Sequence, residues 1–279
     1  MIKPMLCKLQ DKPFNSERVI WEPKYDGVRI LAKVDAAGYK LQARSGADKT
    51  NLFPELKLAS RLPAVFDGEI VAMSGKFNGI QHRANRINGI ANAVDQHPVI
   101  YKIFDILELD GVDMTATSLE NRKGILTRVL TSSENVSESK YTHDGVQLFD
   151  WAKENQQEGI VGKSLAGRYM AGKREWLKVK CWQEEEFLVV GFTKGTGWRA
   201  STFGALVLSD NKGNYVGSVG TGFDNAEIER LCERFMEGTC PFPREPEQAT
   251  WVQPFAVKVK FLEKTSDGML RFPSYKGVV

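Results

Sequence analysis

The segment Glu22-Pro-Lys24-Tyr-Asp26-Gly27-Val-Arg29 is the part of the sequence whose residue types and spacing point most directly to chemistry. Average residue usage places a Lys-x-Asp-Gly-x-Arg pattern in roughly one window in 10⁵. A lysine amine is a nucleophile once it has lost its proton, and an arginine is a strong contact for anions. A charged turn between two strands would also use an Asp-Gly pair, so this segment alone leaves both interpretations open.

Two further lysines lie two residues apart in the strand-like stretch Trp176–Trp182. Alternate side chains of a strand point to the same face, so Lys178 and Lys180 share a face that Leu177 and Val179 do not. Two lysines side by side repel each other unless an anion lies between them. The pattern therefore predicts an anion-binding face, with a half-exposed polar face as the alternative.

Two glycine-containing segments that resemble phosphate-binding loops lack the required context. Gly162-Lys163-Ser164 ends like a Walker A loop, but Gln157 stands where that loop needs its first glycine. The segment 195–200 resembles a dinucleotide fingerprint, yet residues 201–208 look like a strand rather than the helix that would bind the phosphates. We interpret both segments as turns.

The composition is that of an ordinary globular protein. The chain has 279 residues, 42% of them hydrophobic, with 38 basic and 35 acidic side chains and a net charge of +3. These values exclude a disordered, collagen-like or coiled-coil chain. No apolar run approaches the roughly 18 residues of a membrane-spanning helix, and no secretory signal is recognisable, so we expect a cytoplasmic protein. The four cysteines and three histidines are too scattered to predict a zinc site or a disulfide framework.

Short strands and helices alternate over the first two-thirds of the chain, and short strands dominate the rest. A helix is predicted to begin at Thr117, where Thr117-Ser-Leu-Glu120 forms a capping box, and others cover about 146–155 and 225–236. Near the charged run 183–186 the predicted pattern changes from alternating strands and helices to mostly short strands. We therefore predict one domain over 1–184 and a second over 185–279. The predicted strands are 18–22, 28–34, 40–44, 65–73, 99–107, 159–163, 176–182, 187–193, 203–208, 215–219 and 256–262.

Other segments fit the same chemistry as the Lys24 segment. In their order they resemble nucleotidyltransferase motifs I, Ia, III, IIIa, IV and V of the ATP-dependent DNA ligases, over nearly the whole chain. The resemblance implies an α+β fold, with a nucleotidyltransferase (adenylation) domain of antiparallel sheets and flanking helices, followed by a small OB-fold β-barrel. The segments are Glu22–Arg29, Arg44–Gly46, Phe66–Val71, Tyr101–Leu107, Glu158–Lys163 and Trp176–Lys180, with Phe192–Leu206 and Val257–Pro273 in the barrel.

The resemblance implies that Lys24 attacks the α-phosphorus of ATP and expels pyrophosphate. AMP would then pass to the 5′-phosphate of nicked duplex DNA, and the 3′-hydroxyl would displace AMP and seal the nick. Each step is phosphoryl transfer assisted by Mg²⁺, for which Mn²⁺ would substitute. Because Lys24 must be neutral to attack, we expect Arg29, Lys178, Lys180 and Mg²⁺ to lower its pKa.

The same resemblance assigns ligand contacts to the other motif residues. Glu158 would help to hold Mg²⁺, and Glu69 would contact the ribose or a water on the metal. Phe104 would stack on adenine, and the chain at Glu22 would contact adenine mainly through its backbone. The remaining cofactor-binding residues are cations for the phosphates and the ribose, namely Arg29, Arg44, Lys163, Lys178, Lys180 and, for pyrophosphate, Arg271.

Nicked duplex DNA is the expected partner, bound in a strongly salt-dependent manner by a monomer that needs no other protein. Larger ligases carry an Asp-Lys pair after the motif VI arginine, and no such pair follows Arg271 here. Only 23 residues precede Lys24, so no N-terminal DNA-binding domain is expected. The predicted DNA contacts, for which solvated surface is the alternative, are Arg44, Arg83, Arg86, Lys194 and Arg199.

Three other functions remain open at this point. A GTP-using capping guanylyltransferase and an RNA ligase share the fold and the lysine chemistry, but the segment 104–107 and the barrel segments fit DNA ligases better. A non-catalytic nucleic-acid-binding barrel protein with a decayed transferase domain is the third alternative. The presence of every motif side chain argues against that decay.

Overall fold

The computed structural model describes residues 2–74, 77–84, 86, 88–265 and 267–279, in two units. The N-terminal unit spans Met1–Cys181 and the C-terminal unit spans Trp182–Val279. Strand β13 (Gln183–Lys194) begins earlier than predicted, so a boundary after residue 184 would cut this strand. The acidic run forms strand because Glu184 and Glu186 pair across the sheet with Lys260 and Lys258, as opposite charges on neighbouring strands do.

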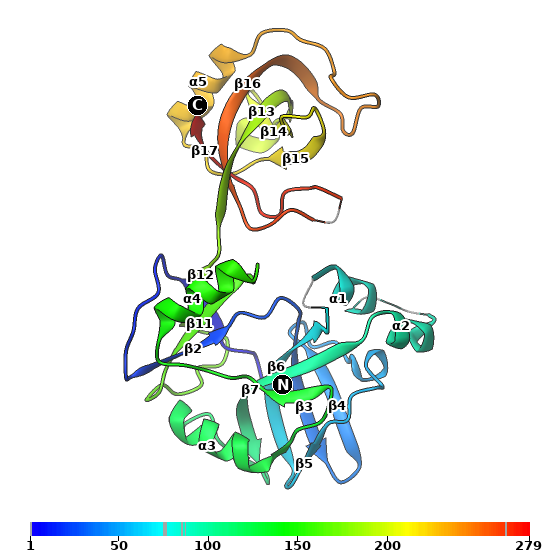
Figure 1. The fold of residues 1–279 in the computed structure, drawn as a ribbon, viewed down its shortest axis with the longest axis vertical. Helices are drawn as coiled ribbons and strands as arrows, with labels where there is room; N and C mark the ends of the chain where they lie inside the picture. Colours follow the sequence, from blue (N-terminus) through cyan, green and yellow to red (C-terminus); the bar gives the residue numbers. More distant parts are fainter. Residues whose placement is uncertain (1, 75–76, 85, 87, 266) are drawn as a thin grey trace. The chain divides into compact units, whose positions relative to one another are not determined.

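Two main sheets build the N-terminal unit, and the strands of each come from distant parts of the chain (Figure 1). Their pairings are antiparallel except for β1 with β12 and β10 with β7, two parallel pairs that the sequence did not predict. The four-stranded sheet has the order β1 (Leu6–Leu9), β12 (Arg174–Lys180), β11 (Gly159–Ser164) and β2 (Val19–Pro23). The six-stranded sheet contains β10 (Val136–Glu138), β7 (Val99–Leu109), β6 (Ala64–Ala72), β3 (Val28–Asp35) and β4 (Gly38–Ala43), with β8 (Val112–Asp113) paired to β7, and β5 (Ala59–Ser60) pairs separately with β9 (Leu130–Thr131).

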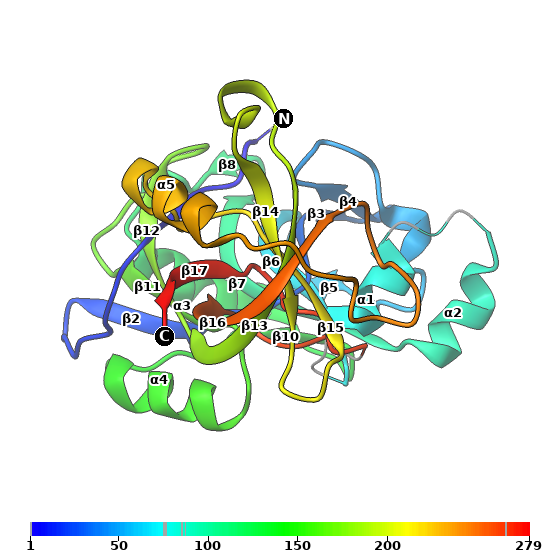
Figure 2. The ribbon, with the colours of Figure 1, turned by 90° about the horizontal axis from the view of Figure 1, so that it is seen from above.

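The helices of this unit flank the sheets. They are η1 (Thr50–Leu52), α1 (Phe77–Ala84), α2 (Ile90–Gln96), α3 (Leu119–Val129) and α4 (Gly145–Glu154). Helix α3 begins one residue later than the predicted capping box, because the Thr117 hydroxyl donates to the Met114 carbonyl at 2.6 Å and Ser118 becomes the N-cap. Helix α4 packs on β2 and β11, as both views show (Figures 1 and 2).

The six-stranded sheet has one apolar face and one face that carries charge. Ile30, with alternate residues of β3 and apolar side chains of β4, β6, β7 and α3, forms the largest core cluster. On the other face, Arg29 of β3 pairs in register with Glu69 of β6, and Glu69 pairs in register with Lys102 of β7. Directly opposed residues on neighbouring strands point the same way, so these three side chains form a row.

The C-terminal unit contains a five-stranded antiparallel sheet and one helix. The strand order is β15 (Tyr215–Val219), β14 (Phe203–Ser209), β13, β16 (Thr250–Phe261) and β17 (Ser274–Val278). Helix α5 (Asn225–Arg234) begins at Asp224, whose carboxylate accepts from the Glu227 amide at 2.7 Å. Segment 195–200 is a turn with the short helix η2 (Gly197–Arg199), as predicted, and leads directly into β14.

None of the helices in the described ranges is long and apolar enough to cross a membrane.

Candidate active site

Strand β11 brings together three charged residues that are far apart in sequence. It lies between β2 and β12, so Lys24 at the end of β2 and Lys180 of β12 both reach Glu158, which immediately precedes β11. The Lys24 backbone N–H donates to the Gly159 carbonyl at 2.8 Å and fixes the start of the loop. The Lys24 ammonium donates to one Glu158 oxygen, and the Lys180 ammonium lies 3.1 Å from the other.

The charged groups around Lys24 favour its protonated form in the nucleotide-free protein. Burial alone would lower the pKa of Lys24, but the Glu158 carboxylate outweighs burial and raises that pKa above its ordinary value. Burial would raise the pKa of Glu158, but Lys24 and Lys180 lower it overall. In the nucleotide-free protein the Lys24 pKa is thus raised rather than lowered, because its nearest charged partner is a carboxylate; that the cations together with Mg²⁺ lower it stays a prediction.

Six of the predicted site residues line one pocket in the N-terminal unit. Five other residues that were not predicted as site residues also line it, namely Cys7, Pro23, Tyr25, Val161 and Trp176. Trp176 lies two residues before Lys178 on the same strand, a spacing that places it on the lysine face and could have identified it. The six predicted residues are Glu22, Lys24, Arg29, Glu69, Phe104 and Lys163.

A buried ion-pair cluster forms one side of this pocket. Lys163 donates to Glu22 at 2.6 Å, and the ammonium of Lys123 lies 2.5 Å from the other Glu22 oxygen. Burial would raise the Glu22 pKa, but the two lysines lower it overall. The Lys163 ammonium also lies 4.2 Å from the Phe104 ring centroid and 4.1 Å from that of Trp176. The Glu22 side chain is thus engaged within the protein, and its backbone pairs with Val161 of β11, so the expected adenine contact stays a prediction.

Arg29 is held by a carboxylate that the sequence analysis missed. Its guanidinium donates to both oxygens of the fully buried Asp67, at 2.5 and 2.7 Å, and lies 4.6 Å from the Phe104 centroid. The Tyr169 hydroxyl donates to Asp67 at 2.5 Å and accepts from the Met5 amide at 2.9 Å. Asp67 lies two residues before Glu69 on β6, so strand alternation could have identified it, whereas nothing in the sequence marks Tyr169.

Glu69 differs from the other carboxylates because its pKa is raised. Burial raises the pKa of Glu69 to about 7, against the opposing pull of Arg29 and Lys24. No group of three or more His, Cys, Asp or Glu side chains in the described part of the chain is arranged to hold a metal ion by itself. Glu69 and Glu158 still suit Mg²⁺, because this ion is commonly held by one or two carboxylates together with waters and substrate phosphates.

Several predicted residues lie outside this pocket. Lys178 is on β12, where burial and then the neighbouring Lys180 lower its pKa. Arg44 is exposed just beyond β4, and the Arg86 guanidinium donates to the nearby Asn88 carbonyl at 3.0 Å. The C-terminal unit carries Lys194, which is exposed, Arg199, and Arg271, which pairs with Glu263 at 2.5 Å.

The burial of Arg83 contradicts its predicted contact with DNA. Its guanidinium is 1% exposed and donates to the carbonyls of Leu52 and His97 at 2.7 and 3.0 Å. It also pairs with Glu55 at 2.7 Å. Arg83 therefore holds η1, α1 and the end of α2 together instead of facing a ligand.

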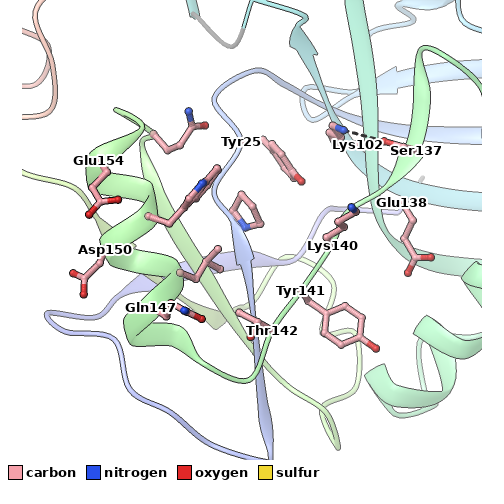
Figure 3. A pocket seen from close by; sticks show the side chains of 14 residues that line it. Tyr25, Lys102, Ser137, Glu138, Lys140, Tyr141, Thr142, Gln147, Asp150 and Glu154 are labelled. Atoms are coloured by element: carbon pink, nitrogen blue, oxygen red, sulfur yellow. Dashed lines mark hydrogen bonds between the residues drawn. The ribbon is translucent and has the colours of Figure 1, made fainter.

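A larger cavity of about 960 Å³ adjoins the pocket through Pro23 and Tyr25. Figure 3 shows Tyr25 and Lys140 pointing into it, with helix α4 opposite and Lys102 donating to Ser137 at 3.0 Å. Neither Lys24 nor the two motif glutamates line it. The smaller pocket therefore remains the candidate site, because the reactive groups gather there.

Comparison with known proteins identifies the class of this enzyme. The family model described as "ATP dependent DNA ligase domain" matches residues 4–180, and that described as "ATP dependent DNA ligase C terminal region" matches residues 194–278. The chain belongs to the ATP-dependent DNA ligase family. The predicted family is confirmed, in preference to the capping guanylyltransferases and the RNA ligases.

Two relatives differ in how much of their length this chain represents. "Multifunctional non-homologous end joining protein LigD" of Mycolicibacterium smegmatis is 31% identical, over 95% of this chain but only 36% of that protein. The chain thus spans about a third of such relatives. "SPbeta prophage-derived DNA ligase-like protein LigB" of Bacillus subtilis is 32% identical, over 99% of this chain and 98% of that protein.

Solved structures support the fold. A structure described as "mycobacterial DNA ligase D complexed with ATP and MES" is 26% identical and covers all of this chain and 95% of that one, with a TM-score of 0.57. A Lig E DNA ligase structure has a TM-score of 0.70 at 19% identity and covers all of both chains. These similarities confirm the predicted α+β fold with an OB-like C-terminal domain.

Proposed function

We propose that this ligase uses ATP and Mg²⁺ to seal nicks with a 5′-phosphate and a 3′-hydroxyl in duplex DNA, acting as a monomer. The observation that carries the proposal is the position of Lys24, whose amine lies in one pocket with the anion-binding Arg29 and Lys163 and the aromatic Phe104. A nucleotide with a planar base and a charged phosphate chain has the complementary chemistry.

The proposed sequence has three transfers, each with its own leaving group. The neutral Lys24 amine forms a P–N bond to the α-phosphorus of ATP, and pyrophosphate departs. An oxygen of the DNA 5′-phosphate then attacks that phosphorus, the P–N bond breaks, and Lys24 takes up a proton again. Finally the 3′-hydroxyl attacks the 5′-phosphorus, loses its proton, and AMP leaves. Positioning and charge neutralisation carry most of the catalysis in such transfers.

The contacts of Lys24, Glu158 and Glu69 indicate what must change before the first attack. Lys24 has to leave Glu158 and lose its proton, since its pKa is raised while the pair persists. Glu158 and Glu69 would hold Mg²⁺, which supplies positive charge next to the phosphates. If Glu158 held a metal ion, Lys178 and Lys180 would be cations on the neighbouring strand that favour the neutral amine.

The test is nick sealing with ATP and Mg²⁺, together with transfer of label from [α-³²P]ATP to the protein. Lys24→Ala should abolish both, while Lys33→Ala, an exposed lysine on β3 in the same unit, should behave as wild type. GTP and nicks with RNA ends are run in parallel. Equal labelling by GTP, better sealing of RNA, or labelling that survives in Lys24→Ala would overturn the proposal.

A further inference from the structure

The turn between β13 and β14 presents a large apolar side chain to solvent. Trp198 in η2 is 72% exposed, more than any other large apolar side chain among the described residues. Isolated exposed apolar residues are common on protein surfaces, so exposure alone indicates nothing about function. What distinguishes Trp198 is how the turn holds it and which charges surround it.

The turn is rigidly built. The Arg199 guanidinium donates to the carbonyls of Gly204 and Gly220, at 3.2 and 3.1 Å, and so ties the turn to neighbouring segments of the same unit. The Arg199 amide donates to the Thr196 carbonyl at 3.1 Å. A Cβ atom at Gly195 would lie 1.9 Å from the Arg199 carbonyl oxygen, so only glycine allows this close approach.

Arg199 also fixes the indole itself. Its guanidinium carbon lies 4.8 Å from the Trp198 ring centroid and 5.7 Å from that of Phe223, within range of cation–π attraction. The ring is therefore supported from within the protein while most of its surface stays open. A side chain with few accessible conformations loses little entropy on binding, which is the property of an aromatic anchor.

The charge around Trp198 indicates the kind of partner. No acidic residue occurs from Phe187 to Ser209, whereas Arg199 and the exposed Lys194 stand on either side of Trp198 in the sequence, and Arg199 lies over its ring. An exposed aromatic ring between cations is the combination that proteins use on nucleic acids, with cations for phosphates and the ring for a base or sugar face. We propose that Trp198 is a DNA anchor of the C-terminal unit, packing against a base or deoxyribose while Lys194 meets the backbone and Arg199 holds the turn and the ring. This inference rests on the proposed function, because it concerns the same DNA substrate.

The experiment measures binding to a fluorescent nicked duplex in EDTA, where no turnover occurs. Trp198→Ala should weaken binding about 5- to 100-fold, as for loss of one aromatic–base contact, and Trp198→Phe should retain most of the affinity. Met236→Ala removes another exposed apolar side chain from the same unit and should leave affinity unchanged. Affinities within twofold of wild type for Trp198→Ala would overturn the inference.

Three further readouts separate an anchor from a structural or electrostatic role. Labelling of Lys24 by ATP without DNA should be unchanged in Trp198→Ala. A loss of labelling as large as the loss of DNA affinity would show that the ring supports the protein itself, and it would refute the inference. The slope of log Kd against log salt should be unchanged in Trp198→Ala but smaller by about one in Lys194→Ala.

DNA should also shield one tryptophan from acrylamide quenching in wild type and none in Trp198→Phe. Quenching that is unaffected by DNA in the wild type would contradict the contact. Absence of sealing in the wild type would refute the proposed function, whereas sealing with an unaffected Trp198→Ala refutes only this inference.

Discussion

Replacing Asp67 by asparagine tests whether a buried carboxylate positions Arg29 for the nucleotide. Asp67 is fully buried and binds the Arg29 guanidinium through two hydrogen bonds of 2.5 and 2.7 Å, while Tyr169 donates to one of the same oxygens. Asparagine keeps the shape but removes the charge, so Arg29 is left buried without its counter-ion. Breaking a buried ion pair in this way costs about 3–5 kcal/mol, a large part of the ~5–15 kcal/mol by which domains are stable.

The effect on the reaction should exceed the effect of lost stability alone. Arg29 lies against Phe104 and lines the pocket that contains Lys24, so a displaced guanidinium should slow lysyl-AMP formation by roughly 10- to 100-fold. The assays are urea unfolding and single-turnover labelling with [α-³²P]ATP at a temperature where both variants remain folded. Burial opposes the charge on Arg29, whereas Asp67 raises its pKa above the ordinary value, and that contribution of Asp67 is lost in the variant. An arginine nevertheless stays protonated in proteins, so the substitution should change the position of the guanidinium rather than its charge.

Glu55→Gln is the matched control for this prediction. Glu55 pairs with the buried Arg83 at 2.7 Å, an ion pair of the same kind that lies outside the pocket. It should lower the free energy of unfolding and leave the labelling rate close to wild type. Equal loss of rate in both variants would attribute the effect to destabilisation. An Asp67→Asn protein that labels at the wild-type rate would show that Asp67 does not position Arg29.

Three other variants test single features of the site. Glu158→Gln should lower the pKa of Lys24, because the carboxylate that stabilises its ammonium is gone. The pH dependence of Lys24 acylation in ATP-free protein, followed by mass spectrometry, checks this prediction. An unchanged midpoint pH would contradict it. Glu69 has a pKa of about 7 in the fold against an ordinary value of 4.5, so its stabilising contribution is complete below about pH 4.5 and is lost as the pH rises through about 7. Glu69→Gln should flatten that decline in unfolding free energy, and a parallel decline in the variant would refute the assignment. Arg83→Met should cost about 3 kcal/mol of stability yet leave DNA affinity within twofold, and a large loss of affinity would restore Arg83 as a DNA contact.

The placement of motif residues could be predicted where a local sequence pattern determines on which face of a strand a side chain lies. The alternation in β12 places Lys178 and Lys180 on one face whatever the rest of the chain does. Their partners could not be predicted in the same way. Glu158 reaches Lys24 across a sequence separation of 134 residues, because β11 lies between β2 and β12, and strand order is a property of the whole fold.

Burial was the main source of error, because it depends on segments distant in the chain. Arg83 looks like a surface cation in sequence, but it is paired with Glu55, 28 residues earlier, and donates to the backbone carbonyls of Leu52 and His97, which carry no sequence signal. The acidic run before Phe187 likewise looks like a solvated domain boundary in sequence, because its partners are far away in the chain. Its counter-charges, Lys258 and Lys260, stand on β16, more than 70 residues later.

The raised pKa of Lys24 follows from how the site balances its charges without a nucleotide. Arg29, Lys178, Lys180 and Mg²⁺ were expected to lower the Lys24 pKa, but without metal or nucleotide Asp67 pairs with Arg29, and Glu158 is shared between Lys24 and Lys180. Cations paired in this way give no net field to drive off a proton. In the proposed reaction, a nucleotide bound with a metal ion would draw Glu158 away from the lysines and so favour the neutral amine. If Lys24 is the nucleophile, its reactivity should therefore rise when the nucleotide binds rather than before.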